Sequence, residues 1–234
     1  MRLLAMDTST FVGTVGVVQD GELLAEWSAS VRASHGETLL PHVARVMELA
    51  GIALADIDAL AVGIGPGSFT GVRIGVATAK GLALALAKPL VGVSSLRTLA
   101  RGLLAGAGLR VPVIDAYKGE VYAAAYGLDE AGALVERMAP FHAPPQQAAE
   151  RLMQEARAEP LWLAGNGLAR YPAFCAALGA HARRAPGLCD VPRAACLAHE
   201  ALLSLEQNGP SDLARLEPLY LRPSDAKLPV QRGE

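Results

Sequence analysis

The sequence has little net charge and few cysteines. Its 234 residues include 21 Lys and Arg against 23 Asp and Glu, for a formal charge of −2. Proteins that bind nucleic acid on their own usually carry a basic face, so this composition predicts that any RNA is held mainly by a partner. Cys175, Cys189 and Cys196 are odd in number and lack paired metal spacing. They indicate free thiols in a reducing compartment.

Signals for export and for a membrane are also missing. The N-terminus reaches Asp7 too soon for a signal peptide. In the long apolar segment that ends near Ala87, Lys80 leaves a run on each side that is too short to cross a bilayer. We therefore expect a cytoplasmic protein with no membrane partner.

Several motifs of catalysis and phosphate binding are incomplete. A Walker loop needs Gly-Lys-Ser/Thr where this chain has Gly71, Val72 and Arg73, and a dinucleotide fingerprint needs a third glycine where Thr70 stands. No Gly-x-Ser-x-Gly elbow surrounds Ser68. The sequence therefore matches none of these catalytic or phosphate-binding fingerprints.

A metal site is not expected either. His35, Glu37 and His42 lie close in sequence, but they do not share one helical face and no third ligand is evident. His199-Glu200 lacks the second histidine of a zinc-protease helix.

What the sequence does have is a stretch from Gly65 to Gly75 that predicts strand, tight turn and helix. An apolar run at 60–64 precedes it, and Ser68 or Thr70 can cap the helix that follows. A glycine-rich turn before a helix is also a potential anion site. Anion binding therefore stays open as a second interpretation of this stretch.

The helix expected to end near Ala87 is apolar almost all round. Gly71, Gly75, Ala79 and Ala83 recur every fourth residue and form a stripe of small side chains. Two interpretations fit: the helix is buried in its own core, or the stripe receives a helix of another protein.

The chain reads as two similar halves. Each opens with an apolar strand, an aspartate (Asp7 or Asp115), a hairpin and a third strand before its helices. The first half contains an amphipathic helix over 34–51, which we expect to be regular only from Leu39 because Pro41 removes a hydrogen bond. This plan predicts an α/β, two-lobed fold of the actin-like ATPase and sugar-kinase type, with duplicated mixed-sheet lobes flanked by helices.

The lobes are expected at 1–105 and 106–191, with a helix at about 192–209 and a flexible tail over 222–234. A degenerate nucleotide site is expected between them. It would comprise Asp7, Thr8, Ser9, Asp115 and Lys118. Active members of the fold follow the second aspartate with glycines, whereas Tyr117 and Lys118 stand here. The alternative is that the aspartates only satisfy hairpin N–H groups.

Four segments resemble the TsaB family, the bacterial partner of TsaD in making threonylcarbamoyladenosine on tRNA. They occur in the family's order and cover most of the chain: 7–9, 34–41, 65–75 and 115–122, with a weaker match at 218–222. Catalytic relatives carry a His-x-x-x-His pair after the helix that ends near Ala87, where this chain has Val93 to Thr98. The resemblance thus implies a non-catalytic subunit, with no catalytic residues and no metal.

The resemblance also implies partners: a TsaD-like transferase, a TsaE-like ATPase, and tRNA indirectly through the complex, with ATP used by the complex and no cofactor assigned to this chain. It places the 192–209 helix on the first lobe. It implies a docking surface on two first-lobe helices, at Leu39, Leu40, Val43, Met47, Gly71, Val72, Gly75, Val76, Ala79 and Ala83. Two alternatives are a stand-alone ATPase or small-molecule kinase of the same fold, and a module whose stripe serves homodimerisation.

Overall fold

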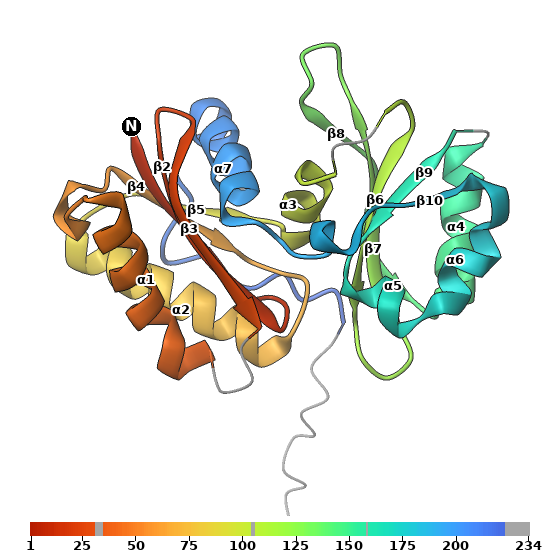
Figure 1. The fold of residues 1–234 in the computed structure, drawn as a ribbon, viewed down its shortest axis with the longest axis horizontal. Helices are drawn as coiled ribbons and strands as arrows, with labels where there is room; N and C mark the ends of the chain where they lie inside the picture. Colours follow the sequence, from red (N-terminus) through yellow and green to blue (C-terminus); the bar gives the residue numbers. More distant parts are fainter. Residues whose placement is uncertain (31–34, 104–105, 158, 223–234) are drawn as a thin grey trace, which may run out of the picture.

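The first half of the chain forms a five-stranded mixed sheet. The computed structural model describes residues 1–30, 35–103, 106–157 and 159–222. The strands lie in the order β3-β2-β1-β4-β5 (Figure 1). They are β1 (Arg2–Asp7), β2 (Val12–Gln19), β3 (Glu22–Ser30), β4 (Ala59–Gly63) and β5 (Leu90–Val93). β1 pairs antiparallel with β2 and parallel with β4. Every residue of β4 is buried, because this inner strand is covered on both faces.

The second half repeats this arrangement. Its strands are β6 (Leu109–Asp115), β7 (Val121–Leu128), β8 (Leu134–Ala143), β9 (Leu161–Ala164) and β10 (Ala182–Arg184). Their order, β8-β7-β6-β9-β10, is that of the first sheet, and β6 again pairs antiparallel with the next strand and parallel with the fourth. The repeated order confirms the predicted two-lobed, duplicated fold.

Helices cover both faces of each sheet (Figure 1). They are α1 (His35–Ala50), α2 (Phe69–Leu86), α3 (Ser95–Arg101), α4 (Pro145–Ala156), α5 (Asn166–Arg170), α6 (Pro172–Leu178) and α7 (Ala194–Asn208), with 3-10 turns at Leu54–Asp56, Gly179–His181 and Gly187–Cys189. The pair α1 and α2 covers the outer face of the first sheet, and α4 to α6 cover the outer face of the second. Between the sheets, α7 packs on the first and α3 on the second.

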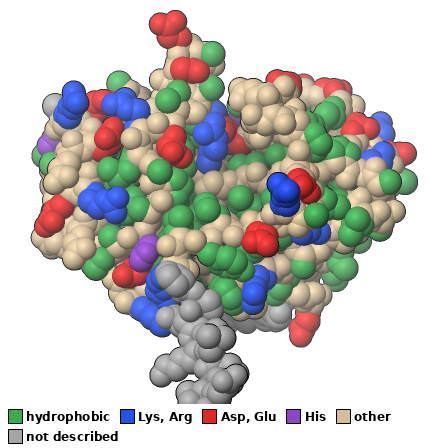
Figure 2. Space-filling model, turned by 180° about the vertical axis from the view of Figure 1, so that it is seen from behind, with side chains coloured by type: hydrophobic (Ala, Val, Ile, Leu, Met, Phe, Trp, Pro, Cys, Tyr) green, Lys and Arg blue, Asp and Glu red, His purple; other side chains and the backbone are tan. Residues whose placement is uncertain are grey.

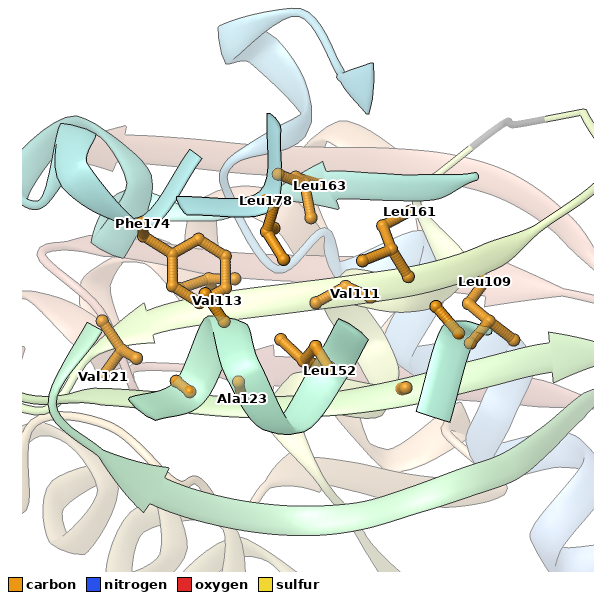
Figure 3. Packing of buried hydrophobic residues seen from close by; sticks show 14 of the residues in the cluster. Leu109, Val111, Val113, Val121, Ala123, Leu152, Leu161, Leu163, Phe174 and Leu178 are labelled. Atoms are coloured by element: carbon orange, nitrogen blue, oxygen red, sulfur yellow. The ribbon is translucent and has the colours of Figure 1, made fainter. Parts of the chain in front are cut away.

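Each lobe has a core on its outer side. In the second lobe, Leu152 of α4 and Phe174 of α6 pack on Val111, Val113 and Leu163 of the sheet (Figure 3). In the first lobe the corresponding core joins α1 and α2 to β1, β2 and β4. The lobes are therefore built in the same way, with helices on the outer face of the sheet and one helix on the face toward the other lobe.

After α7 the chain crosses from the first lobe to the second. The Ser211 N–H donates to the Leu90 carbonyl (2.9 Å), and the Leu219 N–H donates to the Ile64 carbonyl (2.7 Å). At the end of the described chain, the Arg222 guanidinium donates to the Ala116 carbonyl in the second lobe (3.1 Å). The segment thus ties the lobes together, and the remainder of the tail predicted over 222–234 lies outside the described residues.

Three local features differ from expectation. α1 is helical from His35 despite Pro41, and the cost is small because the unpaired Glu37 carbonyl belongs to an exposed residue. The sequence also predicts a helix that Ser94 caps and that ends near Ala105, whereas α3 ends at Arg101. The elements α5, α6 and β10 were not predicted, because each is too short to show a clear period.

Candidate functional site

The glycines of the Gly65 to Gly75 stretch allow close packing against the β1–β2 turn. A Cβ on Gly67 would lie 2.2 Å from the Ser9 carbonyl oxygen, and one on Gly71 would lie 2.1 Å from the Thr8 carbonyl oxygen. The Ser68 N–H donates to the Ser9 carbonyl (2.7 Å), and the Ser68 hydroxyl caps α2 by accepting from the Gly71 N–H (3.3 Å). Because these N–H groups are used within the chain, this turn favours packing over anion binding.

The small stripe of α2 faces the protein's own sheet. A Cβ on Gly75 would approach the Thr8 hydroxyl to 2.4 Å. Ala79 is fully buried and Ala83 is 2% exposed, both within the first-lobe core. This corrects the interpretation in which the stripe receives a helix of another protein: small residues are needed here because α2 lies close to β1.

The other residues expected at a docking surface are also mostly internal. Leu39, Val43, Met47, Val72 and Val76 are buried in the same core. Of the whole predicted set, only Leu40 is exposed, at 52%. The resemblance implied docking on this helix pair, but the predicted residues lie mostly on the faces that fold against the sheet.

The outward face of the same helix pair is also apolar. Leu84 is 69% exposed, and Ala77 and Gly81 lie exposed on the same side of α2. On α1, Leu40 and Ala44 are exposed. A Cβ on Gly81 would meet no atom within 4 Å. The prediction missed Ala77, Gly81 and Leu84, although their spacing of three to four residues is the signal of a second helical face.

By length and composition α2 could also cross a membrane, which the prediction did not allow for. It has 18 residues with a mean hydropathy of 1.3. In the structure, however, one side of α2 is packed on the first sheet, as in a core helix.

On the back of the molecule, Lys and Arg side chains are interspersed with Asp and Glu (Figure 2).

Asp7 and Asp115 occupy matching strand ends, but both are engaged within the chain. Asp7 is 1% exposed and accepts from the Ser9 N–H and the Ser95 hydroxyl, each at 2.7 Å. Burial raises the pKa of Asp7, and these hydrogen bonds oppose the shift. Asp115 is 7% exposed and accepts from the Tyr117 N–H (2.8 Å) and the Tyr171 hydroxyl (2.9 Å). These contacts favour the structural interpretation of the two aspartates.

In the turn after Asp115, two residues with side chains adopt the positive φ angles that normally favour glycine. Tyr117, Lys118 and Gly119 have φ values of 59°, 51° and 84°. The Glu120 N–H closes the turn on the Tyr117 carbonyl (3.0 Å). Two consecutive non-glycine residues in the left-handed region are strained. Phosphate binding by such a turn needs glycines, because the phosphate must approach the backbone N–H groups closely. In this chain, Tyr117 and Lys118 place side chains at those positions.

Replacing Lys118 by glycine should stabilise the protein by about 0.5–1 kcal/mol, because glycine adopts a positive φ without steric cost. Urea denaturation measures the change. Lys118→Ala is the matched control, since it removes the same side chain but keeps the unfavourable φ, and no comparable gain is expected. If the free energy of unfolding of Lys118→Gly is no higher than that of Lys118→Ala, the backbone at Lys118 is not strained.

The histidines near α1 have structural partners. The His35 Nε2 lies 3.0 Å from the Thr10 carbonyl oxygen. His42 stacks on Trp27 with ring centroids 3.4 Å apart, and burial lowers its pKa. Within the described ranges, no group of three or more His, Cys, Asp or Glu is placed to hold a metal.

Two mixed sheets of the same strand order, with helices outside and between them, define a protein of the actin-like ATPase and sugar-kinase class. A structure of this general fold, the activator of the 2-hydroxyisocaproyl-CoA dehydratase from Clostridium difficile with bound ADPNP, matches 88% of this chain and 98% of that one at 12% identity, with a TM-score of 0.50. Such a likeness shows the fold alone.

Closer comparisons give the family. The family model described as TsaD, tRNA N6-adenosine threonylcarbamoyltransferase, matches residues 26–228. The structure of YeaZ from Pseudomonas aeruginosa is 32% identical, with a TM-score of 0.81 over 94% of this chain and 99% of that one. The chain belongs to the TsaD family and, within it, to the TsaB (YeaZ) group.

A curated relative carries a functional name. The Escherichia coli tRNA threonylcarbamoyladenosine biosynthesis protein TsaB is 46% identical over 134 residues, which is 56% of this chain. The matched region spans 58% of the relative's length.

Proposed function

We propose that this chain is a non-catalytic subunit of the complex that makes threonylcarbamoyladenosine on tRNA, and that it binds and supports a TsaD-like transferase. One observation supports the absence of catalysis most directly: Asp7 and Asp115 are both buried and hydrogen-bonded within the chain. The Tyr117 side chain also stands in the turn that an active relative keeps bare. The stand-alone ATPase or kinase alternative needs a free turn and free carboxylates, so it is not favoured.

The docking surface we propose is the outward face of α1 and α2, which consists of Leu40, Ala44, Ala77, Gly81 and Leu84. All five residues are exposed and uncharged, and Ala44, Ala77 and Gly81 are small enough for a partner helix to approach closely. Aliphatic exposure of this kind is typical of an interface. The same face would serve a homodimer of the free chain.

The rest of the assembly follows from the family. The TsaD-like subunit would hold most of the tRNA, since this chain has a charge of −2. A TsaE-like ATPase would supply ATP turnover to the complex, in the cytoplasm. No cofactor is assigned to this chain.

Complementation tests the proposal. In a strain depleted of the native protein, this chain should restore threonylcarbamoyladenosine in tRNA, measured by mass spectrometry of digested nucleosides. It should also co-purify with the TsaD-like protein. Asp7→Asn is the decisive variant, because it keeps the shape of the side chain and removes the carboxylate. Full modification with Asp7→Asn is expected; loss of modification in a folded, partner-bound variant would mean that this chain is catalytic.

A further inference from the structure

The exposed aromatic side chains of this protein all lie in one place. The chain has only two Trp, five Tyr and four Phe, each within the described ranges. Those that are more than 36% exposed are Phe11 (61%), Phe69 (44%), Tyr117 (39%) and Tyr220 (46%). They come from the β1–β2 turn, the start of α2, the second-lobe turn and the C-terminal segment. We call these four residues the aromatic cluster.

A continuous set of contacts joins the cluster. Phe11 and Tyr117 meet edge to face, with centroids 6.5 Å apart. The Ser68 N–H donates to the Ser9 carbonyl (2.7 Å) in the turn that carries Phe11, and the next residue, Phe69, has its ring centroid 5.4 Å from that of Tyr220. The cluster thus spans the junction of the two lobes.

Positive charge accompanies the rings. The Arg73 guanidinium lies over the Phe69 ring, 4.3 Å from its centroid, and donates to the Tyr220 hydroxyl (3.0 Å). On the second-lobe side, Arg170 is 68% exposed and pairs with the Asp115 carboxylate (3.7 Å), which is itself 8% exposed. The Tyr117 N–H donates to the same carboxylate (2.8 Å), so Arg170 lies beside the turn that carries Tyr117. A ligand that binds this surface would therefore contact both guanidinium groups and aromatic rings.

The aromatic cluster differs in chemistry from the outward face of α1 and α2. The outward face of α1 and α2 is aliphatic, which suits a protein helix. The aromatic cluster combines rings with guanidinium groups, which is the combination that holds unpaired bases by stacking and their phosphates by charge.

We propose that the aromatic cluster is a contact site for single-stranded RNA, namely an unpaired loop of the RNA substrate. The proposal rests on the function proposed above. It adds that this chain touches the RNA itself, in a contact too small to hold the RNA without the partner.

The test uses the assembled complex with the TsaD-like subunit and a fluorescent RNA hairpin with an adenosine-containing loop. A fully paired duplex of the same composition is the comparison RNA. Phe11→Ala and the double variant Phe69→Ala/Tyr220→Ala remove exposed rings, so the fold should be retained, as circular dichroism would check. Leu188→Ala, at 76% exposure, is the matched control outside the cluster.

We expect each ring removed to weaken hairpin binding about tenfold, with no effect on the duplex or from Leu188→Ala. Binding should weaken with added salt. Partner affinity, measured without RNA, should not change. If the variants lose partner affinity but bind the hairpin normally, the cluster is a protein contact and the proposal is overturned. Unchanged affinity for both ligands would overturn it equally.

Failure of the proposed function can be told apart from failure of this inference. If no complex forms, the function is contradicted, and photo-crosslinking of the free chain at hairpin concentrations high enough to populate a weak contact still tests the cluster. Crosslinks at Phe69 or Tyr220 would support RNA contact, and crosslinks elsewhere or none would overturn it.

Discussion

Replacing Gly81 by leucine should weaken binding to the TsaD-like partner by a factor of about five to a hundred and fifty while leaving the free chain as stable as before, or more so. The new side chain meets no atom within 4 Å in the free chain. Leucine is also the better helix former, by about 0.5–1 kcal/mol. At a close helix contact, however, it would separate the two surfaces, and overpacking costs about 1–3 kcal/mol, or a factor of about five to a hundred and fifty in affinity.

Ala79→Leu is the matched control, two residues away on the opposite side of α2. Ala79 is fully buried against the first sheet. Its replacement should destabilise the free chain by about 1–3 kcal/mol, a fall in Tm of several degrees. Thermal denaturation measures stability, and titration calorimetry with the partner measures affinity. If Gly81→Leu binds normally while Ala79→Leu alone loses affinity in a folded state, the docking face is misplaced.

This pair of variants shows what the sequence could and could not predict about α2. A four-residue spacing placed Gly71, Gly75 and Ala79 on one face. It could not say which way that face points. The answer depends on Thr8, which approaches Gly75 from the β1–β2 turn, far away in sequence. A stripe of small residues allows any element to pack closely against the helix. Only the fold shows that this element is the protein's own β1–β2 turn.

Local patterns predicted most of the fold. The hairpin predicted in the first half turns at the dipeptide Asp20-Gly21, and Gly21 has the positive φ of 85° that such a turn needs. Asp7 and Asp115 marked the two halves because each ends a buried strand. The aromatic cluster carried no such signal, since Phe11 and Tyr220 stand at opposite ends of the chain and meet through intermediate residues.

A second large effect is expected at Glu200 of α7. Its side chain is 2% exposed and pairs with the guanidinium groups of Arg97 and Arg101 on α3. Those arginines also donate to the carbonyls of Leu134 and Gly132 in the second lobe, each at 2.9 Å. One buried carboxylate therefore links a helix packed on the first sheet to the β7–β8 hairpin of the second.

Replacing Glu200 by glutamine should destabilise the protein by about 3 kcal/mol, because breaking a buried ion pair leaves uncompensated charge. At this chain length the loss corresponds to a fall in Tm of about 6–12 °C. The control is Glu48→Gln, which breaks an exposed pair with Arg45 on α1 and should change stability by less than about 1 kcal/mol. High salt should reduce the small effect at Glu48 and leave the effect at Glu200, since a buried pair is poorly screened. Equal small losses for both variants would mean that Glu200 does not hold the lobes together.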